Sequence, residues 1–256
     1  MNSFLIFTKK ELKEQLRTYK AFVLMITMLF FGITSPVFAK LMPEILNYFQ
    51  TMDSTIQISM KAPAFTDAYA QFYKNIGQMG ILIVILIFCS VVSQEKLKGT
   101  GIIMLTKNLS RPTFILSKFT AMSILWTVCY AVSAATAVFY TVYLFPEGSL
   151  NGVFLSMLCL WLFVELILAI TVLASTLSKN FFIGALCAFG GWGVLMISAS
   201  IPKIKEITPT LLSGSSISLI GGGASFSDFQ SAIIASIVLI VLAITSACVI
   251  LKKQEL

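Results

Sequence analysis

Six long apolar runs limit what this 256-residue chain can fold into. A helix needs about 18 or more consecutive apolar residues to cross a lipid bilayer, and each run is of that length. The sequence therefore predicts an all-α membrane protein with six transmembrane helices in a single domain, residues 1–256. The spans are expected at about residues 21–39, 76–93, 119–144, 150–177, 181–201 and 229–251.

The composition agrees with a membrane protein, because 57% of the residues are hydrophobic and only 11% are charged. Soluble domains have about 25% charged residues. Basic residues outnumber acidic ones by 18 to 11, which gives a net charge of +7. In a soluble chain this excess would suggest nucleic acid. Here it is better explained by membrane topology, and no nucleic-acid partner is expected.

The basic residues are distributed unevenly between the two sides that six spans define. With the N-terminus inside, five basic residues lie in the N-terminal tail, five between spans two and three, one at Lys179 and two at the C-terminus. Only five lie on the other side. Because loops rich in lysine and arginine stay cytoplasmic, we expect a multi-pass protein of the cell membrane with both termini in the cytoplasm.

The first 20 residues are too charged to form a span. Their apolar residues recur near helical spacing, which predicts an amphipathic interfacial helix over residues 1–20 that binds membrane lipid through its basic residues. An ordinary polar tail that happens to be helical is the alternative. The apolar positions are Phe4, Leu5, Leu12, Leu16 and Tyr19.

A cleaved signal peptide is a second alternative for the N-terminal region. The chain has a basic start, an apolar run and then small residues around Ala39, which suit a cleavage site. The basic start is long and amphipathic, however, and the apolar run is long enough to cross a bilayer. We therefore expect this run to remain as the first span.

Two external loops are expected. Residues 40–75 include Pro43 and Pro63 and lack a long apolar run, so we expect a loop with short surface helices. The second loop is expected at residues 202–228. Its part from Thr208 to Ile220 is rather apolar, yet it is too short to cross the bilayer twice.

The connector between spans two and three, residues 94–112, is polar and basic, with Glu95 as its single acid. Gly99 lets the preceding helix end and the chain turn along the membrane face. Glu95 is expected to pair with Arg111 or Lys118, or merely to mark the membrane edge. A connector that is only solvated needs no apolar patch, so this one is expected to dock on another protein. The patch comprises Ile102, Ile103, Met104 and Leu105.

Three features together resemble the ABC-2-type transporter permeases over nearly the whole chain. The first is the N-terminal KKELKEQLRTYK, which leads straight into a span. The second is EKLKGT at 95–100, similar to the family's E-x-x-x-G-T, followed by LSRP at 109–112 and Lys118, similar to its P-x-S-R…K. Asn108 stands where that family often has proline. The third is six spans with a long last external loop.

The resemblance implies that the connector is a coupling helix seated in a groove of a separate ATP-binding cassette ATPase. Two ATPase copies would bind ATP and magnesium, and a second permease copy would complete the transporter as a homodimer or a heterodimer. It also implies re-entrant helices at Thr208–Ile220, for which an extended surface cap is the alternative. The coupling residues would be Glu95, Gly99, Thr100, Ile102, Ile103, Met104, Leu105 and Arg111.

Within that family the chain looks most like small permeases of Gram-positive bacteria that export amphipathic or antimicrobial peptides, such as phenol-soluble modulins. Export of drugs, antibiotics or sodium is the alternative. A stand-alone membrane protein, either a channel or an intramembrane enzyme, is the rival from a different class. A channel should show a filter loop or rings of charge, and an enzyme should show clustered acids or histidines within spans, whereas this sequence has neither, only Glu165.

The sequence offers no catalytic or cofactor motif. It has no histidine and no G-x-x-x-x-G-K-[ST] phosphate loop, and its five cysteines lie inside apolar runs without metal-ligand spacing. We therefore expect a permease that is not itself an enzyme and that binds neither a metal nor a cofactor. ATP hydrolysis is expected in the partner chain.

Glu165 is the one ionisable residue near the middle of a span. A charge there costs about 2.5 to 3.5 kcal/mol on insertion scales, so the side chain should face the protein interior or a cavity. It is a candidate for the substrate pathway, where it would meet a cationic group of the cargo. The alternative is a neutral or paired packing acid, hydrogen-bonded to Thr171 or to another helix.

Overall fold

The computed structural model describes residues 3–52, 62–99, 110–202, 204, 206–220 and 222–254, with the backbone alone for residues 46–52 and 215. These residues form helices and no strand. Six helical segments are long and apolar enough to cross a membrane, which confirms the predicted class. They cover Lys20–Ile45, Phe65–Leu97, Arg111–Leu144, Val153–Leu177, Phe181–Ser198 and Phe226–Lys253.

The chain begins with α1 (Ser3–Arg17) and turns at Tyr19, whose φ is 59°, into α2 (Lys20–Met52). The second span combines four helical pieces, α3 (Phe65–Asn75), the π-helical η1 (Ile76–Gly80), α4 (Ile81–Phe88) and α5 (Ser93–Leu97). The remaining spans are α7 (Arg111–Leu144), α8 (Val153–Leu177), α9 (Phe181–Ser198) and α11 (Gln230–Lys253). Short helices α10 (Leu211–Gly214), η2 (Ser215–Leu219) and η3 (Phe226–Phe229) precede α11.

The predicted external loop at 40–75 is wrong at both ends. Helix α2 continues through Pro43 to Met52, and α3 begins at Phe65. Segment α3 is amphipathic rather than uniformly apolar, so its polar face hides it from a search for apolar runs. Its buried face comprises Ala68, Tyr69, Phe72 and Tyr73, and it packs on α2.

Helix α8 lies at the centre of the bundle and contacts α11, α9, α7, α4 and the short helices α10 and η2. Because lipid tails are as apolar as the side chains, close packing rather than water exclusion holds such helices together. Two glycines mark close approaches between the segments of different spans. A Cβ at Gly32 would lie 2.7 Å from the carbonyl oxygen of Ser133, and one at Gly184 would lie 2.5 Å from that of Cys89.

The apolar part of the second loop folds into short helices that pack on α8 and α3, so it is not an extended surface cap. Leu212 is fully buried, and the hydroxyl of Ser156 donates to the carbonyl of Ser216 over 2.7 Å. Such backbone is tolerated in a membrane protein where it is enclosed by protein. Whether this segment dips into the bilayer stays a prediction.

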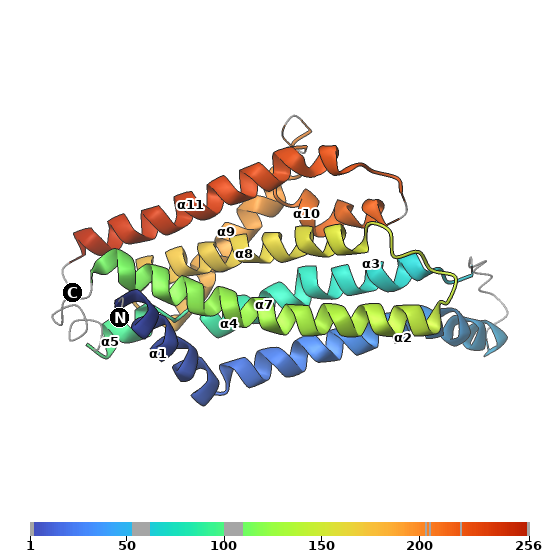
Figure 1. Ribbon diagram of the computed structural model, residues 1–256, viewed down its shortest axis with the longest axis horizontal. Coiled ribbons are helices and arrows are strands. Elements are labelled where there is room, and N and C mark those ends of the chain that lie inside the picture. The colour runs from blue at the N-terminus through green and yellow to red at the C-terminus, as the bar shows by residue number, and fades with distance from the viewer. Residues whose placement is uncertain are drawn as a thin grey trace.

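Both termini lie at the same end of the bundle, together with α5 and the start of α7 (Figure 1). The turn between α7 and α8 lies at the opposite end, as does the far end of α2 (Figure 1). This arrangement follows from an even number of spans. It gathers the N-terminal helix, both stems of the connector and the chain end on one side.

Candidate functional site

The two stems of the connector are well defined in the structure. The stem on span two ends at α5, and Gly99 follows in the left-handed conformation with a φ of 66°, as expected of a residue that stops a helix. The stem on span three begins at Ser110, whose hydroxyl caps α7 by accepting from the amide of Thr113 over 3.3 Å. The predicted coupling residues Thr100, Ile102, Ile103, Met104 and Leu105 lie outside the described residues.

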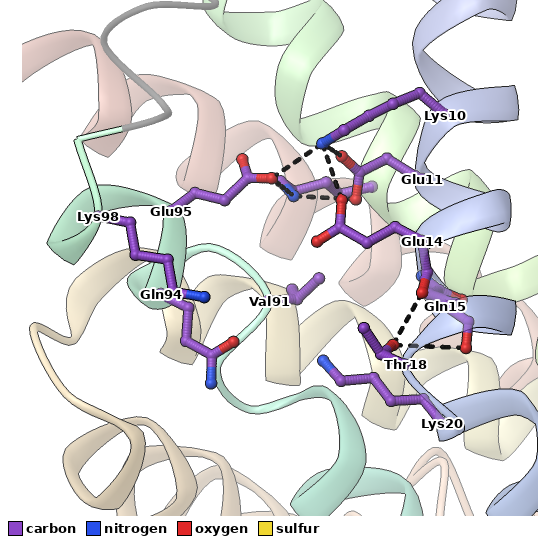
Figure 2. Close-up of a pocket in the computed structure, with 11 residues that line it drawn as sticks. Lys10, Glu11, Glu14, Gln15, Thr18, Lys20, Val91, Gln94, Glu95 and Lys98 are labelled. Carbon is purple, nitrogen blue, oxygen red and sulfur yellow. Dashed lines mark hydrogen bonds and ion pairs between the residues drawn. The ribbon is translucent and has the colours of Figure 1, made fainter.

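Five charged side chains from α1, α5 and α7 meet beside these stems, and we call them the charge cluster (Figure 2). Lys118 of α7 lies at its centre and is 1% exposed. Its Nζ lies 3.0 Å from Glu11 Oε2 and 3.0 Å from Glu95 Oε1. The cluster comprises Lys10, Glu11, Glu14, Glu95 and Lys118.

Lys10 closes the cluster from the solvent side. Its Nζ lies 2.9 Å from Glu11, 2.9 Å from Glu14 and 3.2 Å from Glu95. Burial acts to lower the pKa of Lys10, but the surrounding carboxylates outweigh it, so this pKa is raised. Burial likewise acts to raise the pKa of Glu14, yet the Lys10 ammonium holds it below its ordinary value. Both shifts favour the charged forms.

The three carboxylates of the cluster converge closely enough to suggest a metal site, with ligand oxygens within 4.8 Å of one another. The ammonium groups of Lys10 and Lys118 already bind these oxygens, however. A metal ion would have to displace buried ion pairs, and removing one partner from such a pair is strongly destabilising. We therefore assign no metal to the charge cluster.

Of the two partners predicted for Glu95, Lys118 is the one it binds. Arg111 turns away and caps the C-terminal end of α11, where its Nη1 donates to the carbonyls of Leu251 (2.9 Å), Lys252 and Gln254 (3.3 Å). The last carbonyls of a helix lack partners within the helix, so a guanidinium is well suited to them. Arg111 thereby joins the start of α7 to the end of α11.

Lys96 anchors the stem on span two to the ends of α8 and α11. Its Nζ donates to the carbonyl of Thr176 near the end of α8 and to Oε1 of Gln254 over 2.6 Å. The hydroxyl of Ser175 in turn accepts from the amide of Val92 over 3.0 Å. Together with the charge cluster, these contacts tie both stems to α1, α8 and α11, and we call this arrangement the stem frame.

Glu165 lies in the interior of the bundle and is 4% exposed. Its Oε1 accepts from the hydroxyl of Ser123 on α7 over 2.8 Å, whereas Thr171 donates within its own helix to Ile167. The partner of this acid is therefore on another helix, one of the two arrangements predicted. One turn away, the indole of Trp161 donates to Thr127 over 3.0 Å.

An apolar groove of about 970 Å³ opens between α7 and α8 next to the hydrogen-bonded pair of Trp161 and Thr127. Thr127 and Trp161 lie at its edge, and aromatic and aliphatic side chains form most of its wall, including Tyr130, Phe139 and Phe154. The groove and Glu165 are thus neighbours along the same two helices. Glu165 is not among the residues that line the groove.

Sequence reasoning found Glu95, Gly99, Arg111 and Glu165, but it missed Lys10, Glu11 and Lys96. A helical register was visible, since Phe7, Glu11 and Gln15 recur every four residues and are all buried. A polar face on an N-terminal helix is normally expected to be exposed to solvent. In the structure the polar face of α1 packs against α7 instead.

Comparison with known proteins agrees with this architecture. Residues 5–256 match the ABC-2 family transporter protein family. The chain is also similar to YxlG of Bacillus subtilis (strain 168), described as an uncharacterized transmembrane protein, with 22% identity over 201 residues, or 78% of each chain. Six membrane-spanning helices and a match over nearly the whole length lead to one conclusion. The chain is a multi-pass membrane protein that belongs to the ABC-2 family of transporter proteins, a family of transport subunits that work with an ATP-binding cassette ATPase.

Proposed function

We propose that this permease is the transmembrane subunit of an ATP-driven exporter of the cell membrane. The family match over residues 5–256 carries the proposal. Two copies of the permease would pair, as a homodimer or with a related chain, above two ATPase copies that bind ATP and magnesium. The placement of both termini and both connector stems at one end supports a cytoplasmic location for all of them (Figure 1).

The connector acts as the coupling element in this proposal. Closure of the ATPases would push on the apolar patch at 102–105, and the stems would carry the displacement into the bundle. The stem frame supports this role because Lys96 and Arg111 bind the ends of α8 and α11 directly. Bonded stems transmit a displacement to whole helices, whereas free loops would absorb it.

Amphipathic or antimicrobial peptides are the cargo we propose. The apolar groove between α7 and α8 would take the apolar face of such a peptide, and Glu165 would bind a cationic group. Drugs, antibiotics or sodium are the alternative cargo. A stand-alone channel is the candidate from another class, and it would carry its cargo without ATP.

The coupling role can be tested with Ile103→Asp in the permease reconstituted with its ATPase. A charge in the apolar patch should abolish permease-stimulated ATP hydrolysis, measured as phosphate release, because docking would bury the carboxylate. Ile207→Asp is the matched control, since Ile207 is an exposed isoleucine in the second loop. Full stimulation in Ile103→Asp would exclude docking at this patch, and cargo flux without the ATPase would favour the channel.

A further inference from the structure

A pocket of about 300 Å³ lies beside the charge cluster, between α1, the start of α2 and the end of span two (Figure 2). The charge cluster forms one side of it. The other side is formed by Gln15, Thr18, Lys20, Val91, Gln94 and Lys98. These residues take no part in the contacts described above for the stems, so the pocket needs its own explanation.

The cations around the pocket are not all neutralised. The cluster carboxylates bind Lys10 and Lys118, but among the described residues no carboxylate lies within ion-pair distance of Lys20 or Lys98. Figure 2 shows the side chains of Lys20, Gln94 and Lys98 around the same open space. The pocket therefore offers two ammonium groups and an amide to an anion.

Gln15 supplies an independent sign of a ligand. Its side chain is buried, with the residue 4% exposed, and neither its Nε2 nor its Oε1 has a hydrogen-bond partner among the described residues. Buried polar groups of native proteins nearly always find a partner. Both amide atoms are closed to solvent as placed, so Gln15 reaches a ligand in the pocket only when its side chain turns toward it.

The surroundings of the pocket favour a lipid over a soluble ion. Lys20 begins the first span, so the pocket lies where the bundle meets the membrane surface. Apolar side chains flank its cations in the sequence and are largely exposed, namely Tyr19 (72%), Phe22 (62%) and Leu97 (63%). Cations next to exposed apolar groups match a phosphate headgroup that carries acyl chains.

We propose that this pocket binds the phosphate group of an anionic phospholipid in the leaflet that surrounds the termini. Lys20 and Lys98 would pair with the phosphate, and Gln15, once its side chain turns into the pocket, would donate to one of its oxygens. Bound lipid would bridge α1 to the stem at Lys98 and so strengthen the stem frame. The site is independent of the ATPase and of the cargo, apart from the membrane topology that it shares with the proposed function.

The test uses the purified full-length permease without ATPase, and its probe is phosphatidylglycerol against phosphatidylcholine. Phosphatidylglycerol should raise the melting temperature of the wild type, and the increase should be lost in Lys20→Gln/Lys98→Gln. The matched control is Lys9→Gln/Lys13→Gln, which removes the same charge from exposed positions of α1 and should keep the increase. Equal losses in both double variants, or none in the first, would overturn the site.

Two further arms identify the ligand. Gln15→Leu removes the unpaired amide while keeping its bulk, so it should fold and bind phosphatidylglycerol about tenfold more weakly, as loss of one charge-assisted hydrogen bond implies. Unchanged affinity in Gln15→Leu would contradict the role of the amide. Inorganic phosphate and glycerol phosphate, added in detergent, should give no stabilisation. An increase as large as that from the lipid would assign the pocket to a soluble anion instead.

Discussion

Glu95 and Glu165 are both buried acids, yet their surroundings differ. Glu95 lies between two ammonium groups, those of Lys118 at 3.0 Å and Lys10 at 3.2 Å. Glu165 receives a hydrogen bond from the neutral hydroxyl of Ser123 at 2.8 Å. The charge of Glu95 helps to join three helices, whereas Glu165 has no cation within ion-pair distance among the described residues. We therefore expect mutations at the first site to affect the fold and those at the second to affect transport.

The largest effect is expected for Lys118→Met, which removes the buried cation between Glu11 and Glu95 and leaves them only the partly exposed Lys10. Breaking a buried ion pair in this way costs about 3 to 5 kcal/mol. The melting temperature in detergent should fall sharply, and less protein should reach the membrane. Lys118→Met/Glu11→Gln should recover part of the loss, because one of the two carboxylates that lose Lys118 is neutralised. A single variant as stable as the wild type would refute a structural role for the cluster.

Next in size is Glu165→Gln, which removes the charge but keeps the hydrogen-bonding shape. Export of a basic amphipathic peptide from vesicles should fall roughly tenfold, as expected when a charge-assisted contact worth about 1.5 kcal/mol is lost. The melting temperature should be unchanged, since the Ser123 hydroxyl can still donate to the amide oxygen. Glu147→Gln, in the exposed turn after α7, is the control. If export persists while stability drops, Glu165 is a packing acid.

A smaller effect is expected for Arg111→Ala, which removes the cap on the end of α11. The hydrogen bonds of a charged group contribute about 1.5 to 3 kcal/mol, shared here among three carbonyls. Amide hydrogen exchange near residues 250–254 should become faster while the middle of α11 keeps its protection. Lys252→Ala, an exposed neighbour, should leave this exchange unchanged. Slow exchange at this end in Arg111→Ala would show that the cap is dispensable.

The smallest effect is the pH dependence at the exposed edge of the cluster. The pKa of Glu14 is lowered from its ordinary 4.5, so its contribution to stability is complete above pH 4.5 and is lost as pH falls through the lowered value. The pKa of Lys10 is raised from 10.5, so its contribution is lost only as pH rises beyond that value. Thermal unfolding of Glu14→Gln should therefore lose less stability in acid than the wild type. Because Glu14 is half exposed, solvent screening keeps this difference small.

The sequence was a good guide to the spans and to the helix stop at Gly99, because apolar length and glycine conformation are local properties. The predicted start of the second span, residue 76, lies after α3, which belongs to that span in the structure. Helix α3 was missed because charged residues such as Asp67 and Lys74 alternate in the sequence with its buried aromatic residues. The sequence also offered two partners for Glu95, and only the arrangement of α1 and α7 decides between Lys118 and Arg111. Pairings between distant segments depend on packing, which no local pattern encodes.

The amphipathic pattern of residues 1–20 correctly predicted a helix, but it left open which face is buried. In the structure the buried face of α1 includes Glu11 and Gln15, and exposed Leu5 and Leu16 are available for lipid contact. In soluble proteins apolar residues are usually buried and polar residues exposed. On α1 the order is reversed, because lipid accepts exposed apolar side chains and the protein interior accepts charged side chains that are paired. Whether a charged side chain of α1 is buried therefore depends on whether it has a partner of opposite charge in the protein.

The length of α2 has a practical consequence. Its 33 residues make a rod about 50 Å long, whereas the hydrocarbon core of a bilayer is about 30 Å thick. If the helix stands upright in the bilayer, about 20 Å of this rod extends beyond the hydrocarbon core. A cysteine introduced at the far end of α2 should react with a membrane-impermeant dye on intact cells only if that end faces outside, so such labelling tests the proposed sidedness.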